Sequence, residues 1–105
     1  MIKPDLLGTV TYIKSGGRTF PVQSGYRANC NLEGETANHS YAIWFINKDV
    51  LKLGKSCECK FKFSFSDNEG FNIVVSEGQK IELNEGLLKV GELIIKKILN
   101  EKLIV

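Results

Sequence analysis

The strict alternation of side chains from Cys57 to Phe65 is the feature that most limits what this chain can fold into. Cysteine or phenylalanine occupies every second position, and the residues between them are charged or small and polar: Glu58, Lys60, Lys62 and Ser64. Successive side chains of a β-strand point to opposite faces, so the pattern predicts a strand with one buried and one solvated face. We therefore expect the rings of Phe61, Phe63 and Phe65 to lie in the interior of the protein.

Other stretches with the composition of strands precede and follow this one. β-Branched and aromatic residues gather in Leu6 to Lys14 and in His39 to Ile46, and Val22 to Leu32 and Lys80 to Leu83 are two further expected extended segments. Gly25 interrupts the second of these stretches, where it indicates a bulge or a close approach of the backbone. Polar, glycine-containing turns separate the strands, and Asn84-Glu85-Gly86 is a typical hairpin signal. Turn signals at such short spacing favour a small antiparallel barrel.

The segment from Leu87 to Leu99 is compatible with either a helix or a strand. Its apolar residues recur at helical spacing, and it contains no proline. Gly91 disfavours the helix by about 1 kcal/mol. The alternative is a strand that is apolar on both faces near Leu93 to Ile95, as a strand that closes a barrel can be. The residues alone leave both structures open.

Length, charge and cysteine content limit the class of protein. The 105 residues carry a formal net charge of +2, and we expect them to form one domain spanning residues 1–105. A dedicated nucleic-acid binder usually has a stronger basic bias. We see no signal-peptide pattern and no apolar run long enough to span a membrane. Three cysteines are an odd number, and with no export signal we expect reduced thiols and a cytoplasmic location. The lack of a spanning run predicts that no membrane is a partner.

The two arginines of the chain both lie between Gly16 and Asn29. The other cations are twelve lysines spread along the sequence. Arginine presents a flat, permanently charged fork suited to a carboxylate, a phosphate or an aromatic face. Glycines before each arginine allow the backbone to approach a partner closely. The candidate binding residues of this corner are Gly16, Gly17, Arg18, Tyr26 and Arg27. The alternative is a tight hairpin whose arginines pair with nearby carboxylates.

The expected strand from His39 to Ile46 is apolar on both faces. One face carries His39, Tyr41, Ile43 and Phe45, and the other carries Ala42, Trp44 and Ile46. A barrel strand with water outside should have one polar face. Either a loop covers the outer face or the face binds a partner, and in the second case Tyr41 and Trp44 are the candidate contacts. Lys60 and Lys62 could join the arginines in a basic surface, although a solvated strand face is the simpler interpretation.

Three short patterns resemble nucleotide-binding or metal-binding motifs, but each lacks a residue or a spacing that the motif requires. Gly54-Lys55-Ser56 matches the end of a phosphate-binding loop, but Asp49 stands where that loop needs its first glycine. Val50 replaces the aspartate of the guanine-reading NKxD pattern. Cys30, His39, Cys57 and Cys59 could supply four zinc ligands, but the last two lie in an apolar strand face and lack CxxC spacing. We therefore expect no nucleotide, metal or other cofactor, and no enzymatic activity.

The chain resembles the third, C-terminal domain of elongation factor Tu. In that domain a Gly-Gly-Arg turn is followed by proline and then by Gly-Tyr-Arg, as in residues 16–27 here. Leu53-Gly54-Lys55 resembles its Pro-Gly-Asp turn, and Gly78 to Leu99 resembles its closing hairpin. The similarity is collinear and spans nearly the whole chain. It implies an all-β fold, a single closed antiparallel barrel of six strands, in which Leu87 to Leu99 is a strand.

The resemblance also implies a function. The third domain of elongation factor Tu has no catalytic residues, touches the GTPase domain and helps to hold the T stem of aminoacyl-tRNA. This chain resembles that domain alone, without the GTPase. Arg18 corresponds to the side that faces tRNA, whereas Thr19 replaces the family's histidine and Leu87-Leu88 replace a glycine and an arginine. We expect Arg18 to be presented to a partner and Arg27 to pack onto its own barrel, against Tyr26 or a nearby carboxylate.

Two functions follow as hypotheses. The first is a non-catalytic, stand-alone binding module for tRNA or another translation component, which uses Arg18 and Arg27. The second is a protein–protein interaction or structural barrel with no nucleic-acid role, whose partner binds the apolar strand from Tyr41 to Ile46. Phosphate binding weakens steeply as salt rises and apolar docking does not, so salt dependence separates the two.

Overall fold

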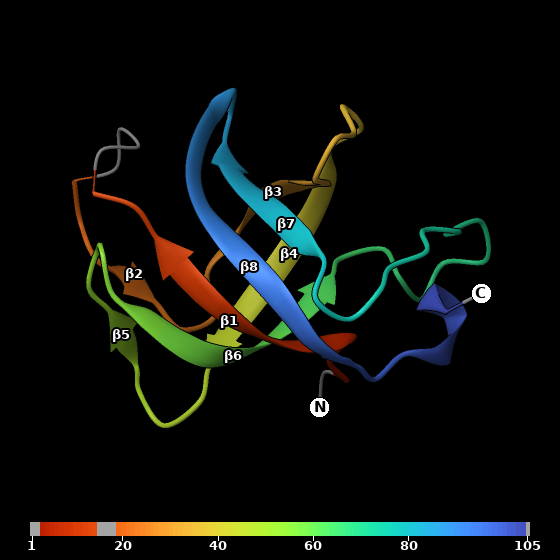
Figure 1. Cartoon of the computed structure of the whole chain (residues 1–105), viewed down its shortest axis with the longest axis horizontal. Coiled ribbons are helices and arrows are strands. Elements are labelled where there is room, and N and C mark those ends of the chain that lie inside the picture. Colours follow the sequence, from red (N-terminus) through yellow and green to blue (C-terminus); the bar gives the residue numbers. More distant parts are fainter. Residues whose placement is uncertain (1–2, 15–18, 105) are drawn as a thin grey trace.

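Six antiparallel strands close into a barrel in the part of the chain that the computed structural model describes, residues 3–14 and 19–104 (Figure 1). Around the barrel the strands follow the order β1-β6-β4-β3-β7-β8, and β8 pairs with β1 to close it. The bounds are Leu6–Tyr12 (β1), Arg27–Leu32 (β3), His39–Phe45 (β4), Ser56–Phe63 (β6), Lys80–Glu85 (β7) and Leu88–Ile98 (β8). The predicted all-β class and the closed six-stranded barrel are confirmed.

The remaining elements are small. Val22–Gln23 (β2) and Val50–Leu51 (β5) pair as a separate two-stranded ribbon, and Glu101–Leu103 (η1) forms one turn of 3₁₀ helix. Within the described ranges no helix has the length and apolar character needed to cross a membrane.

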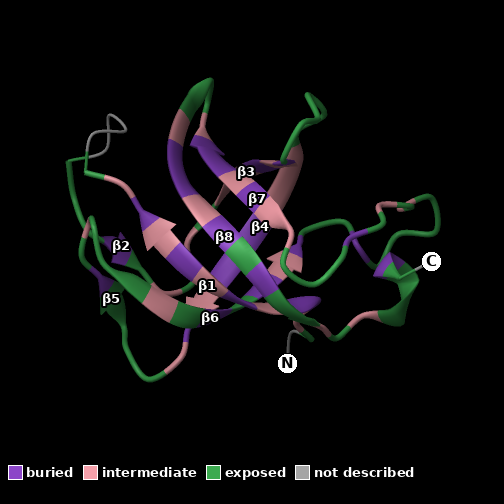
Figure 2. Cartoon of the chain, in the orientation of Figure 1, coloured by how far each residue is buried: buried purple, intermediate pink, exposed green. Residues whose placement is uncertain are grey.

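β6 shows the predicted alternation of buried and more exposed side chains up to its end at Phe63. Phe61 and Phe63 are fully buried, and the Phe61 ring stacks on Tyr41 with centroids 5.1 Å apart. Buried and more exposed residues alternate along β1 as well (Figure 2). Phe65 is 58% exposed, so its predicted interior position is wrong. The strand ends at Phe63, and a turn in which the Ser66 amide donates to the Phe63 carbonyl (3.1 Å) takes Phe65 out of the pleat.

The extended segment predicted from Val22 to Leu32 consists of two strands that belong to different sheets. Gly25 lies between them with a φ of +93°, a conformation that residues with a side chain rarely adopt. Its amide donates to the Ile43 carbonyl (2.7 Å), and the Ser24 hydroxyl accepts a bond from the Phe45 amide (2.9 Å). This turn moves the chain out of the ribbon with β5 and into the barrel beside β4.

β8 is a strand over its whole length. It pairs with β7 from Leu88 to Ile94 and with β1 from Gly91 to Ile98. Val90 and Gly91 are both buried where the register between β7 and β8 shifts, so two successive residues face inward and the simple period of two is broken. A Cβ at Gly91 would lie 2.6 Å from the Thr11 carbonyl oxygen, so only glycine fits without a shift of backbone. The bulge thus explains why the sequence spacing did not identify a strand.

Candidate binding face

The outer surface of β3, β4 and β6 carries cations around a tryptophan. Arg27 lies opposite Ala42, Ala42 opposite Lys62, and Trp44 opposite Lys60. Each alternates with inward-facing neighbours and so points away from the core. β4 is three strands from β8 in either direction around the barrel, so this surface lies on the far side of the barrel from β8 (Figure 1). We call these five residues the β4 face.

The cations of the β4 face are only partly neutralised. The side chains of Arg27 and Lys60 are exposed, and neither forms an ion pair with another described residue. Lys62 Nζ lies 3.1 Å from Asp67 Oδ2, and the Asp67 side chain is 83% exposed. The Lys62 side chain itself is only 12% exposed, and its Nζ also donates to the buried Ser66 Oγ (2.8 Å), so Lys62 is held by its own neighbours. An anion at this face therefore meets two unpaired cations, Arg27 and Lys60.

Trp44 is partly exposed beside these cations. The turn at Gly25 lies along one edge of the indole, since a Cβ built on Gly25 would be 3.9 Å from Nε1. Ala42 is only 6% exposed. The apolar surface that the β4 face offers to a partner is therefore mainly that of one indole ring.

The row that contains Trp44 continues across two more strands. Lys60 lies opposite Leu7, and Leu7 lies opposite the exposed Lys97. Measured along the sheet, with neighbouring strands about 4.8 Å apart, the row from Trp44 to Lys97 covers about 14 Å, and it follows the curve of the barrel so that Lys97 of β8 lies on the opposite side from Trp44. Glu58 is the next outward residue of β6, and a hydrogen bond from Lys96 (2.6 Å) lowers the pKa of its carboxyl. The negative charge closest in sequence to Lys60 on this strand thus already has its own cation.

The outer surface of β7 and β8 differs because it neutralises itself. Lys80 pairs with Glu33 (3.4 Å) and Glu92 (3.5 Å), and Lys89 pairs with Glu92 (2.8 Å) and Glu82 (3.9 Å). The hydrogen bond from Lys89 is the main cause that lowers the pKa of Glu92, and the bond to Glu33 is the main cause that raises the pKa of Lys80. A charged partner gains little from Lys80 or Lys89, because each of these lysines already has two carboxylates.

The corner predicted from the sequence lies only partly in the described residues. Gly16 to Arg18 fall outside them. Tyr26 is partly buried, its hydroxyl donates to Glu85 Oε2, and its ring meets that of Tyr12 edge-on with centroids 6.1 Å apart. Tyr26 therefore helps to hold the start of β3 against the end of β7.

Two of the residues predicted from the sequence are placed differently by the structure. Tyr41 is fully buried, and its hydroxyl is hydrogen-bonded to that of Tyr12 (2.8 Å), so the prediction that it contacts a partner is wrong. It lies on the inner face of β4, whereas Trp44 lies on the outer face. The expectation that Arg27 packs onto its own barrel, against Tyr26 or a nearby carboxylate, is wrong in its second alternative, because Arg27 is exposed and forms no ion pair with a carboxylate of the described residues.

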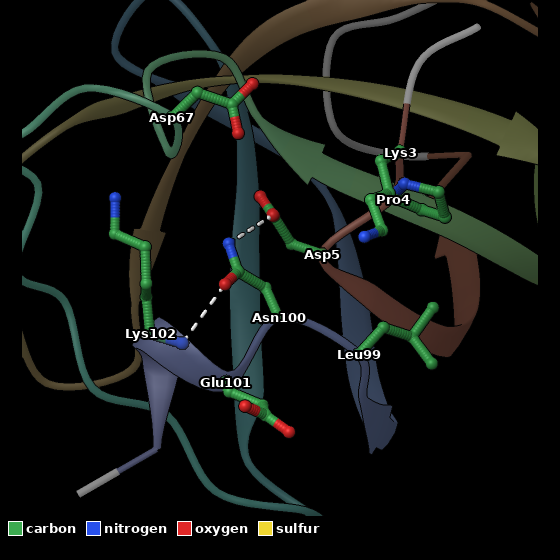
Figure 3. A pocket seen from close by; sticks show the side chains of 8 residues that line it. All are labelled: Lys3, Pro4, Asp5, Asp67, Leu99, Asn100, Glu101 and Lys102. Atoms are coloured by element: carbon green, nitrogen blue, oxygen red, sulfur yellow. Dashed lines mark hydrogen bonds between the residues drawn. The ribbon is translucent and has the colours of Figure 1, made fainter.

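A pocket of about 800 Å³ lies where the segment before β1 meets the segment after β8 (Figure 3). Its lining residues are Lys3, Pro4, Asp5, Asp67, Leu99, Asn100, Glu101 and Lys102. Asp5 is 1% exposed, and its carboxylate accepts bonds from the Phe63 amide (2.9 Å), Ser66 Oγ (3.0 Å) and Asn100 Nδ2 (2.9 Å). Both carboxylate oxygens are thus used to join the two end segments to β6.

Ser66 has the neighbours of an activated hydroxyl but not the access. Lys62 Nζ donates to its Oγ (2.8 Å), which in turn donates to Asp5, yet Ser66 is fully buried and a substrate cannot reach it. Burial also raises the pKa of the Cys30 thiol to about 12 and raises that of Cys59, which makes both poor nucleophiles. Among the described residues there is no group of three or more side chains that could hold a metal ion.

Sequence reasoning missed Lys97 and Asp5. The position of Lys97 opposite Leu7 depends on a register shift between β1 and β8 after Leu7, which no local sequence pattern predicts. Asp5 is a single carboxylate before a strand, and only its buried partners show its role. No protein-family model matches this chain, and no curated protein sequence matches it.

Proposed function

We propose that this chain is a non-catalytic, stand-alone binding module whose partner is RNA, held at the β4 face. The observation that carries the proposal is the register that sets the exposed, unpaired Arg27 and Lys60 on either side of Trp44 on three neighbouring strands. Cations that hold phosphates, combined with an aromatic ring, are the usual elements of an RNA-binding surface. The resemblance to the third domain of elongation factor Tu points to tRNA or another translation component in the cytoplasm as the partner.

Protein–protein docking through an apolar strand face has weaker support. Of the outward residues of β4, Ser40 is polar and Ala42 is almost completely covered. Trp44 remains as the main exposed apolar group, and Lys60 lies directly opposite it. A protein interface normally has a contiguous apolar centre with its charges at the rim. One indole bordered by cations does not provide such a centre.

The test is binding of labelled bulk tRNA, measured by fluorescence anisotropy from about 50 to about 200 mM salt. We expect the logarithm of the affinity to fall linearly with the logarithm of the salt concentration. Each of Arg27→Ala and Lys60→Ala should make that slope shallower by roughly 0.7–0.9, the contribution of one phosphate contact.

Lys89→Ala is the matched control, because it also removes one lysine from an outward strand position but on the self-neutralised surface. It should leave the slope unchanged. Binding that does not depend on salt, or that weakens as much with Lys89→Ala as with Lys60→Ala, would contradict the proposal. Arg18→Ala in the same assay tests the corner near Gly16 separately.

A further inference from the structure

We infer that the β4 face binds a single-stranded RNA segment, with one unpaired base stacked on Trp44 and neighbouring phosphates at Arg27 and Lys60. This inference rests on the proposed function and adds the conformation of the RNA that is recognised. It concerns the outer surface of β3, β4 and β6, where the tryptophan and the unpaired cations lie together.

The first argument is the position of the ring between cations. Lys60 is the direct cross-strand neighbour of Trp44 on β6. Arg27 lies opposite Ala42, two residues from Trp44 along β4, and is therefore a diagonal neighbour about 7–8 Å away. A base on the indole thus has a cation on each side. Single-strand binding sites combine an aromatic platform with cations that follow the backbone in the same way.

The second argument is the row of polar side chains beside these residues. Asn29 of β3 lies opposite Ser40 of β4. This is the next outward-facing pair along the two strands after Arg27 and Ala42, on the side away from Trp44. Both are partly exposed. An amide and a hydroxyl can bond to the edges of a base that has left its stack, and unpaired RNA bases are usually read in this way.

The third argument compares the shape of the β4 face with the shape of an RNA duplex. The deep, narrow major groove of duplex RNA excludes side chains, and its bases remain stacked on each other. In the described residues the only helical element is the three-residue turn η1, and the β4 face is formed by residues of β3, β4 and β6, so it presents only strands. Trp44 can stack on a base only if that base is unpaired.

The experiment compares an RNA of about ten nucleotides, within the usual site size, with the same strand annealed to its complement. Trp44 is the only tryptophan in the chain, so its emission reports on this face alone. We expect the single strand to quench this emission to saturation and to bind at least about ten-fold more tightly than the duplex. Trp44→Ala should weaken single-strand binding at least about five-fold, and Trp44→Phe should keep most of it, since stacking is what the ring supplies.

The outcomes separate this inference from the proposed function. Unchanged Trp44 emission at saturation, duplex binding as tight as single-strand binding, or full affinity in Trp44→Ala would each overturn the stacking inference. If binding in that case still depends on Lys60, the proposed RNA-binding function stands without it. If neither RNA binds at low salt, both fail. Thermal melts confirm that each variant is folded, and quenching in the unaltered protein needs no variant.

Discussion

Replacing Asp5 by alanine should destabilise the barrel more than any other single removal of a carboxylate. The change deletes an acceptor of three hydrogen bonds, from the Phe63 amide, Ser66 Oγ and Asn100 Nδ2. It leaves the Phe63 amide without its partner in a buried site, which costs about 1–3 kcal/mol, and the other two bonds contribute about 1 kcal/mol each. We expect a total loss of about 3–5 kcal/mol.

A loss of this size is a large part of the stability of a small domain, which is about 5–15 kcal/mol. Each kcal/mol lowers the melting temperature of a domain of about 100 residues by about 4–8 °C, so Asp5→Ala should melt about 12–40 °C lower. The assay is thermal unfolding followed by circular dichroism, together with urea titration. Asp5→Asn keeps one acceptor oxygen, so its melting temperature should lie between those of the unaltered protein and Asp5→Ala.

Asp67→Ala is the matched control for Asp5→Ala. Asp67 lines the same pocket and pairs with Lys62, but its side chain is 83% exposed, so its removal should cost less than about 1 kcal/mol. If Asp5→Ala and Asp67→Ala melt within a few degrees of each other, the hydrogen bonds of Asp5 do not hold the end segments to β6, and the reasoning is refuted.

Three other outcomes can be measured on the same protein. Phe63→Ala should cost roughly 3–5 kcal/mol because its ring is fully buried, whereas Phe65→Ala, from the same alternating run, should change stability by less than about 0.5 kcal/mol; equal losses in urea titration would contradict this. Gly91→Ala should cost about 1–3 kcal/mol because its Cβ meets a backbone carbonyl, and Gly70→Ala, with open space around it, should be neutral or slightly stabilising by thermal melt. Alkylation mapped by mass spectrometry should modify Cys57 first, because the other two cysteines are buried in the core; simultaneous labelling of all three in the folded protein would argue against that packing.

Local patterns in the sequence determined which segments are extended and which side of most strands faces inward. The alternation before Phe63 follows directly from the period of two of a pleated strand, and the structure keeps it. The same pattern continues to Phe65, but a turn ends the strand first, and no property of that phenylalanine signals the end. Gly25 marked a special backbone position correctly, although only its φ and its bond to Ile43 show that the chain changes sheet there.

The sequence by itself identified strands over most of the chain, because alternation, turn residues and β-branched content are local properties that do not depend on neighbours. For Leu87 to Leu99 the residues left helix and strand open, because the bulge at Val90 and Gly91 hides the period of two, and the pairing of β8 with β7 and β1 made it a strand. The tertiary structure decided which strands are neighbours, and with that the site. Arg27 and Lys60 lie far apart in the chain and share one face only because β4 pairs with both β3 and β6. Tyr41 and Trp44 lie on the same strand but face opposite sides of it. The Tyr41 ring points inward and fills the core, whereas the Trp44 ring points outward and is partly exposed. Strand pairing and register depend on contacts between residues that are far apart in the sequence, so a local pattern does not predict them.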